Sequence, residues 1–524
     1  MPMEPRPESE RAWALLKTAL ALGLLADLLL RELPWGFNFS LWAGVLAATG
    51  LLFRRWSALH PGRRSWPLVL AAAGGAGFAW RDSPTLGLLF VSTMVALSAA
   101  ALLERPLRAG VGAYASAAVA TLVSIPILIL RVLAEGGWQE RFATPRRRQA
   151  LVVLRGTLLA MPLLLLFGAL FASADPLFER TVTNILDLGF EDIASHTAFA
   201  LLFAVLAGGL LEGQDRFVLR DMAPPRKKPR GSAEAVVVLL LVDLLFLAFL
   251  VVQAGSLFGG REIVETTLGL NYAEYARQGF FQLVTVATIV LPLLLAADWA
   301  APPGSKDRRK LVSIGAALVV MTAAVLASAA HRMRLYQEVY GLTELRLYTS
   351  AFMLWLAIVL AWLLATVFRG RRERFAAPAL AAALASVLAL AALNPDALIV
   401  RVNASRTHQS AVGSALAGRP AGGVGFDAGY AASLSADAVP ALVSVLPRLA
   451  PLERCAVAEH LLARWWSAES DWRTWNWSRW RAIRLVEDRE PALRRTADAC
   501  RHPLQAQLDG RRRPGGPFPA VLIR

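Results

Sequence analysis

Long runs of apolar residues, separated by short charged loops, fill the chain from residue 12 to residue 392, and a more polar segment follows. Most runs have roughly 15 to 25 residues, about the length of an α-helix that spans a hydrocarbon core of ~30 Å. The pattern predicts an all-α fold, a polytopic transmembrane helical bundle of about 11–12 segments with a C-terminal soluble helical module. The predicted membrane segments are 12–30, 40–53, 66–80, 84–103, 110–131, 151–173, 195–213, 234–258, 279–298, 311–330, 347–368 and 375–393.

The same pattern divides the chain into four regions. We expect N-terminal membrane helices in 1–140, a transmembrane core in 141–393, a linker in 394–428 and an α-helical tail in 429–524. The linker is predicted because its second half is rich in Gly, Ala and Pro, residues that punctuate regular structure.

Within the tail, apolar residues recur at helical spacing. Ser435 is a suitable N-cap for a helix over 436–448, and Pro451 suits the first turn of a helix over 451–467. Two further helices are predicted over 477–487 and 490–501.

The chain has a formal net charge of +16, and its basic residues are concentrated in the short loops between apolar runs. A nucleic-acid-binding protein would need a contiguous basic face, so we expect no nucleic-acid partner. Basic loops mark the cytoplasmic side of a membrane protein, and from residue 141 their alternation places the tail on the outer face. With 11 crossings the N-terminus is then in the cytoplasm. Fifty arginines against five lysines, with heavy use of Ala, are typical of a GC-rich bacterial genome, and we therefore expect a bacterial inner (plasma) membrane.

The number of crossings in residues 54–148 is open. The basic loops 54–65 and 141–148 both favour the cytoplasm, but three apolar stretches lie between them, and an even number of crossings is required. The stretch 66–80 is short and contains Gly74-Gly75. One interpretation makes it re-entrant or interfacial, which leaves 11 crossings; the other keeps 12 crossings and accepts a local violation of the charge rule.

Two segments rich in Tyr, Glu and Arg lead into membrane helices, and they hold five of the seven tyrosines of the chain. One interpretation is a polar outer vestibule in which these side chains meet a ligand. The other is an interfacial belt, in which Tyr and Arg anchor helix ends at the level of the lipid headgroups. The candidate residues are Glu265, Tyr272, Glu274, Arg277, Arg332, Arg334, Tyr336, Glu338, Tyr340, Glu344 and Arg346.

Asp243 lies near the centre of the predicted segment 234–258 and is the main intramembrane candidate. An ionisable group at mid-bilayer costs at least ~2.5–3.5 kcal/mol on insertion scales, so it normally faces the protein interior with a partner. Asp243 is then either a functional residue of a transport path or a structural residue paired with a neighbouring helix.

Asp175 precedes Pro176 directly after the segment 151–173. Asp before Pro ends a helix and begins a turn. The alternative is that Asp175 binds a cation or a lipid headgroup at the outer surface, which would require a second acidic group nearby, namely Glu179, Asp187, Glu191 or Asp192.

The tail combines aromatic residues with arginines. Trp and Arg together suit a surface that lies on anionic lipid headgroups, but they equally suit a small core or a ligand-binding face. The tail also holds both cysteines of the chain, Cys455 and Cys500, which form a disulfide if the tail is outside the cell and remain free thiols otherwise. The tryptophans are Trp465, Trp466, Trp472, Trp475, Trp477 and Trp480.

No motif of a known enzyme class is found in the sequence. His-Glu-x-x-His, the Walker loop, Gly-x-Ser-x-Gly and Cys-x-x-Cys do not occur. We therefore expect no metal and no cofactor, and we favour the non-enzymatic interpretations.

Five separated stretches occur in the order typical of one family. The chain resembles the bacterial multipass membrane proteins grouped as domain of unknown function 4153/4173, over roughly 150–490. The resemblance implies a multipass protein of a bacterial cell membrane and implies no catalytic residue. The stretches are 154–178, which ends in Asp175-Pro-Leu-Phe178; 265–281; Arg334-Leu-Tyr-Gln-Glu-Val-Tyr-Gly-Leu-Thr-Glu-Leu-Arg346; Asn394-Pro-Asp-Ala-Leu-Ile399; and Leu434-Ser-Ala-Asp-Ala-Val-Pro440.

Three functions remain open at this point. The first is transport or binding of a small solute or lipid, with Asp243 in the path. The second is a membrane-embedded transferase that acts on a lipid-linked or headgroup substrate, with Asp175 at its site. The third is a membrane sensor or scaffold whose tail binds a partner.

Overall fold

The structure is a computed structural model of the chain, and it folds as two compact units. The first unit comprises 1–79, 90–224 and 472–474, and the second comprises 80–89, 225–471 and 475–524. The residues that the structure describes are 8–57, 65–135, 191–217, 232–258, 280–300, 307–416, 426–466 and 471–511, with scattered positions between 156 and 178.

The first unit consists of apolar helices that approach one another at small residues. Gly23 on α1 lies against Ala200 and Ala204 on α9, where a larger side chain would collide with the α9 backbone. Such small residues allow close contact between helices in lipid. The helices of this unit are α1 (Glu8–Leu30), α2 (Phe37–Ser57), α3 (Trp66–Trp80), α4 (Pro84–Ala100), α5 (Val111–Glu135) and α9 (Glu191–Arg216), of which α3 and α4 contribute their residues outside 80–89.

Charged residues buried in the first unit are paired with one another. Arg131 Nη1 on α5 lies 2.8 Å from Glu212 Oε2 and 2.9 Å from Asp215 Oδ2 on α9. Arg11 adds a second cation 3.6 Å from the same Asp215 oxygen. Because buried charges are tolerated when opposite charges surround them, this cluster belongs to the packing of the unit.

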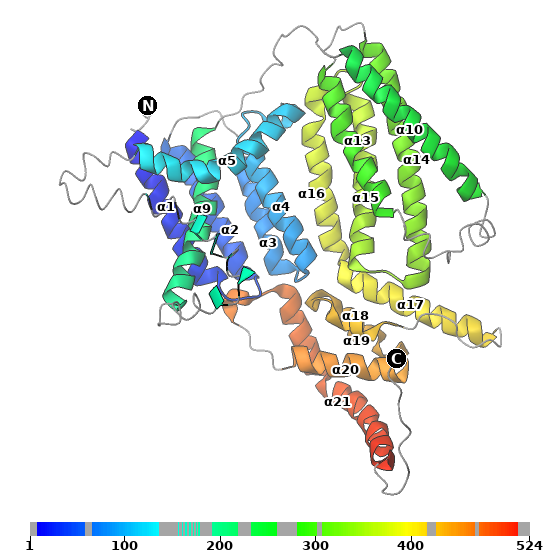
Figure 1. The fold of residues 1–524 in the computed structure, drawn as a ribbon. Coiled ribbons are helices and arrows are strands. Elements are labelled where there is room, and N and C mark those ends of the chain that lie inside the picture. The colour runs from blue at the N-terminus through cyan, green and yellow to red at the C-terminus, as the bar shows by residue number, and fades with distance from the viewer. Residues whose placement is uncertain are drawn as a thin grey trace. The chain divides into compact units, whose positions relative to one another are not determined.

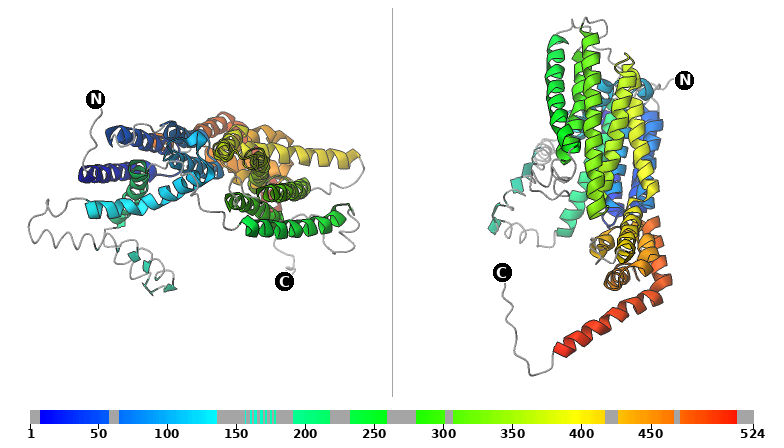
Figure 2. Two further views of the ribbon diagram at one scale, coloured as in Figure 1. Left: turned by 90° about the horizontal axis from the view of Figure 1, so that it is seen from above. Right: turned by 90° about the vertical axis from the view of Figure 1, so that its right-hand side faces the viewer.

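The second unit contains a bundle of long apolar helices and the tail. In Figure 1, α13 to α16 run alongside one another, and both views of Figure 2 agree with this arrangement. The bundle helices are α10 (Ser232–Phe258), α13 (Phe280–Ala300), α14 (Arg308–Tyr340), α15 (Glu344–Thr366) and α16 (Ala376–Leu393).

Eight helices among the described residues are long and apolar enough to cross a membrane. This finding confirms the all-α polytopic fold. The shorter apolar helices α3 and α4 do not reach this length, and at 1.5 Å per residue α3 is about 22 Å long, less than a hydrocarbon core. The number of crossings in this part of the chain stays a prediction. The eight helices are α1, α2, α9, α10, α13, α14, α15 and α16.

The tail packs around a hydrophobic core of its own. Ile399 and Val400 from α17 (Pro395–Leu416) are fully buried in it, together with Val457 and Leu461 from α20 (Pro451–Trp465). The remaining tail helices are α18 (Ala428–Ser433), α19 (Val439–Val445) and α21 (Trp477–Arg511). In both figures these helices gather at one end of the α13–α16 bundle.

Two parts of the tail differ from the sequence prediction. Residues 395–416 form α17 where a linker is expected over 394–428, because Pro395 and Asp396 start a helix whose apolar side chains join the tail core. The predicted helices over 477–487 and 490–501 are one helix, α21, which continues through Pro491. The N-cap prediction holds, since Ser435 Oγ accepts the N–H of Asp437 at 3.2 Å and Pro451 lies in the first turn of α20.

Candidate functional site

The predicted vestibule residues that the structure describes lie around the turn between α14 and α15. Helix α14 continues to Tyr340, beyond the predicted limit of its membrane segment, and ends at Gly341, which has a φ of 77°. Glu265, Tyr272, Glu274 and Arg277 lie outside the described residues. Arg332, Arg334, Tyr336, Glu338 and Tyr340 are on the last turns of α14, and Glu344 and Arg346 are on the first turn of α15.

Arg346 packs against this turn. Its guanidinium lies 4.1 Å from the ring centroid of Tyr336, and it donates hydrogen bonds to the backbone oxygens of Tyr340 and Gly341. A cation over an aromatic ring and at the C-terminus of a helix is stabilised by both. Of the predicted residues, Tyr336, Tyr340 and Arg346 are thus brought into contact, and the choice between an interfacial belt and a vestibule stays open.

The same turn is fixed to the tail through its backbone. Asn403 of α17 accepts the N–H of Leu342 at 2.7 Å and donates to the Leu342 oxygen at 2.9 Å. Tyr430 of α18 accepts the N–H of Glu344 at 2.9 Å. Because three backbone groups of the turn find side-chain partners in the tail, the tail is built onto the end of the bundle.

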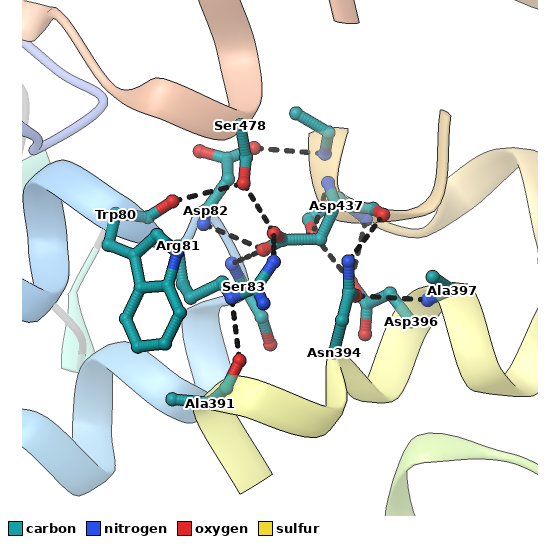
Figure 3. A network of polar contacts seen from close by, with 12 residues as sticks. Trp80, Arg81, Asp82, Ser83, Ala391, Asn394, Asp396, Ala397, Asp437 and Ser478 are labelled. Carbon is teal, nitrogen blue, oxygen red and sulfur yellow. Dashed lines mark hydrogen bonds and ion pairs between the residues drawn. The ribbon is translucent and has the colours of Figure 1, made fainter. Parts of the chain in front are cut away.

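A buried carboxylate, Asp437, is the centre of the most densely connected polar cluster in the second unit (Figure 3). It is 2 % exposed and lies in the 3-10 helical turn Ala436–Ala438, directly before α19. Arg81 Nη1 lies 3.1 Å from Asp437 Oδ1, and Ser478 Oγ donates to the same oxygen at 2.5 Å. The N–H groups of Asp82 and Ser83 donate to Asp437 Oδ2 at 2.8 and 3.1 Å.

The loop between α3 and α4 supplies most of the donors in this cluster. Arg81 also donates to the oxygen of Ala391 at 2.7 Å, and Asn476 and Ser478 donate to the backbone oxygens of Arg81 and Trp80 at 3.0 Å. Asp437 is therefore joined to the loop, to the end of α16 and to the start of α21.

A second buried carboxylate, Asp396, lies beside the first. It is 1 % exposed and accepts the Ser435 hydroxyl at 2.5 Å and the Ser435 N–H at 3.2 Å, both at Oδ2. Its Oδ1 is buried, and no described residue forms a hydrogen bond with it. Burial raises the pKa of Asp396 to about 7, the Ser435 hydroxyl opposes this rise, and the negative charges of Glu344 and Asp437 add to it.

Asp82 is the third acid of the cluster. Arg479 Nη1 lies 3.1 Å from Asp82 Oδ1, and the N–H of Ala436 donates to Oδ2 at 3.1 Å. Burial raises the pKa of Asp82 above its ordinary value, although Arg479 acts in the opposite direction. Among the described residues, no group of three His, Cys, Asp or Glu side chains is arranged to hold a metal. The cluster is therefore suited to holding segments together and to taking up a proton at Asp396.

Our sequence interpretation did not single out Asp396, Asp437 or the Arg81-Asp82-Ser83 loop. The family resemblance could have drawn attention to two of these residues, because Asp396 lies in the stretch 394–399 and Asp437 in the stretch 434–440. Polar residues directly after an apolar run are common at helix ends, so these positions alone do not indicate burial.

The intramembrane candidate Asp243 lies midway along α10 and is half-buried. Its Oδ1 is buried, and the part of the chain that the structure describes supplies no hydrogen-bond partner for that atom. Gln253, ten residues further along α10, donates to Ser328 Oγ on α14 at 2.7 Å. One helix thus carries a paired and an unpaired polar side chain.

Asp175 is exposed, and its Oδ1 accepts the N–H of Leu177 at 2.8 Å. A side chain that bonds to the backbone two residues on forms an Asx-turn, the arrangement expected of the Asp-Pro turn. Glu179, Asp187 and the side chain of Glu191 lie outside the described residues, and Asp192 is exposed in the first turn of α9. Whether a second acid approaches Asp175 therefore stays open.

In the tail, Trp465 is 7 % exposed and belongs to the core, whereas the other tryptophans of the 465–480 group are 40–62 % exposed. Trp477 and Trp480 stack with ring centroids 5.2 Å apart. Cys455 is buried on α20. The side chain of Cys500 lies outside the described ones, so the pairing of the two cysteines stays a prediction.

The comparisons with known proteins identify a family whose description names no activity. A family model described as "Domain of unknown function (DUF4153)" matches residues 68–445. No curated protein and no solved structure is similar enough to count as a match. The matched range includes the Arg81-Asp82-Ser83 loop, Asp243, Asp396 and Asp437.

Proposed function

Since the chain belongs to the DUF4153 family and is an integral membrane protein, we propose that it binds or transports a small solute or a lipid through the helices of its second unit. Asp243 is the polar residue of the path in this proposal. The observation that carries it is the buried Asp243 Oδ1, for which no described residue is a hydrogen-bond partner. A carboxylate in hydrocarbon without a partner is costly, and such residues mark substrate or ion pathways in membrane proteins.

The test compares Asp243→Asn with Asp175→Asn. Both substitutions replace a carboxylate by an amide of equal size, one within α10 and one in an exposed turn. Cells that lack the protein would be complemented with wild type, with either variant or with empty vector, and their solute and lipid contents would be profiled by mass spectrometry. We expect the Asp243→Asn profile to match that of the empty vector and the Asp175→Asn profile to match that of wild type.

The other outcomes identify the alternatives. Loss of function at Asp175, together with dependence on added divalent metal, would replace this proposal by the membrane-embedded transferase. If both variants show the wild-type profile at equal amounts of protein in the membrane, the result would favour a sensor or scaffold function.

A specific observation favours the sensor or scaffold as a second candidate. The tail is joined to the helix ends through Asp437, Asn403 and Tyr430, and Asp396 within this junction has a pKa of about 7. A change of pH or a partner bound to the tail could therefore alter the junction. The exposed Trp and Arg side chains of the tail suit contact with anionic headgroups.

We also propose that the protein resides in a bacterial inner membrane, with the N-terminus in the cytoplasm and the tail outside. Treatment of intact cells with a membrane-impermeant thiol reagent tests this. Labelling of Cys455 only after reduction supports an external, disulfide-bonded tail. Labelling only in permeabilised cells would place the tail in the cytoplasm and change the number of crossings by one.

A further inference from the structure

An apolar groove separates α15 from α16 in the second unit. Its volume is about 430 Å³, within the range of 300–1,000 Å³ usual for ligand sites. The groove exists because alanines line it from both helices and leave space that a neighbouring side chain does not fill. The lining residues are Ile358, Val359, Ala361, Trp362, Pro378, Ala379 and Ala382.

One end of this groove adjoins a basic turn, residues 369–374. The indole N–H of Trp362, a lining residue, donates to the backbone oxygen of Arg374 at 3.1 Å, so the turn lies next to this end of the groove. Arg369, Arg371 and Arg374 are exposed there, and Glu373 is the one acid among them. Trp at the level of the headgroups and Arg beside it are typical of a lipid interface.

The turn is held in place by a pairing that leaves the three exposed arginines available. Arg372 Nε lies 2.6 Å from Asp298 Oδ2, and Arg308 Nη1 lies 3.0 Å from Asp298 Oδ1. Gly370, with a φ of 79°, allows the chain to reverse direction after α15. Arg372 is thus used in positioning, whereas its neighbours project their charge outward.

We propose that this groove binds an anionic phospholipid, with an acyl chain between α15 and α16 and the phosphate at Arg369, Arg371 and Arg374. Charge complementarity identifies the occupant, since basic pockets between membrane helices bind anionic headgroups. The sequence places the turn 369–374 on the cytoplasmic side, where anionic lipids attract basic segments. The proposal is independent of the role proposed for Asp243.

The test is lipid binding to the purified full-length protein, measured by native mass spectrometry with phosphatidylglycerol and phosphatidylcholine of identical acyl chains. We expect wild type to bind phosphatidylglycerol roughly tenfold or more better than phosphatidylcholine. The combined substitutions Arg369→Gln, Arg371→Gln and Arg374→Gln should abolish this preference. A matched control, Arg401→Gln, Arg448→Gln and Arg489→Gln, removes the same charge from exposed positions outside the tryptophan-rich stretch 465–480 and should retain the preference.

A second arm tests the groove. Ala379→Phe fills it and should lower the binding of both lipids, whereas the exchange Ala381→Phe on the exposed side of α16 should not. A phosphatidylglycerol with a photoreactive acyl chain should label residues 358–382 of the unaltered protein, which guards against a variant that fails to fold. The proposal is overturned if wild type shows no headgroup preference, if the arginine variant retains it, or if groove filling and photolabelling reveal no lipid between α15 and α16.

Discussion

Asp437 and Asp243 are both carboxylates of the second unit with buried oxygens, but their surroundings are opposite. Asp437 meets a guanidinium, a hydroxyl and two backbone N–H groups, drawn from segments far apart in the sequence. Asp243 has a buried oxygen without a hydrogen-bond partner among the described residues. A buried charge with all its partners holds a structure together, whereas one without them is retained for another reason. The comparison therefore assigns a structural role to Asp437 and makes Asp243 the functional candidate.

The largest effect is expected from Asp437→Ala. It leaves Arg81 and two backbone N–H groups buried without their acceptor, and breaking a buried pair in this way costs about 3–5 kcal/mol. Thermal melting of the full-length protein in detergent should show a strongly lowered melting temperature. Asp437→Asn keeps the size of the side chain and one acceptor oxygen, so its melting temperature should lie between those of wild type and Asp437→Ala. A wild-type melting temperature for Asp437→Ala would contradict the structural role.

The next effect concerns Asp396 and depends on pH. Its folded-state pKa of about 7 lies above the ordinary value of 3.8, so the folded protein holds a proton that the unfolded chain releases. Stability associated with this group is therefore fully present below about pH 4 and is lost as the pH rises through 7, by on the order of 1–4 kcal/mol.

Asp396→Asn mimics the protonated acid and isolates this contribution. The variant should equal wild type in melting temperature below about pH 4, and its advantage over wild type should grow between pH 4 and 7 and level off above pH 7. The rest of the sequence is unchanged, so the difference in melting temperature between the two proteins reports on Asp396. A difference that does not vary with pH would show that Asp396 is ionised throughout.

A smaller effect is expected at Asp243, where removal of the carboxylate should not lower the melting temperature. Asp243→Leu removes a carboxyl group with an unpartnered buried oxygen and should leave the melting temperature unchanged or slightly raised. On the same helix, Gln253→Leu removes the hydrogen bond to Ser328 and should lower stability by about 1–2 kcal/mol. If Asp243→Leu is the more damaging of the two, Asp243 has a structural partner and the contrast with Asp437 fails.

The smallest effect is expected at Asp175. Its carboxylate is exposed and accepts the nearby N–H of Leu177, which water can satisfy in its place. Asp175→Ala should have the melting temperature of wild type. A clear loss of stability would indicate a contact of Asp175 beyond this turn.

Some features of the candidate sites followed from local sequence. Asp243 was found because a single acid within an apolar run is conspicuous, and the Asp175 turn was expected from the Asp-Pro pair alone. The vestibule residues were a different case, since the density of Tyr, Glu and Arg in 334–346 predicted a polar surface but not how it is used. The structure packs Arg346 on Tyr336 and connects the turn to Asn403, contacts that no spacing within the segment specifies.

The sequence by itself determined the membrane helices and the helical character of the tail. Each helix that crosses a bilayer must satisfy its own backbone within one apolar run, and that requirement is local. The Asp437 cluster was decided only by tertiary structure, because its donors at Asp82 and Ser83 are 355 and 354 residues away in the chain. Residue 395 onward likewise became a helix, not a linker, because the tail core offered a place to bury Ile399 and Val400. Hydropathy reports where a side chain prefers to be, whereas the partner that it meets depends on how distant segments pack.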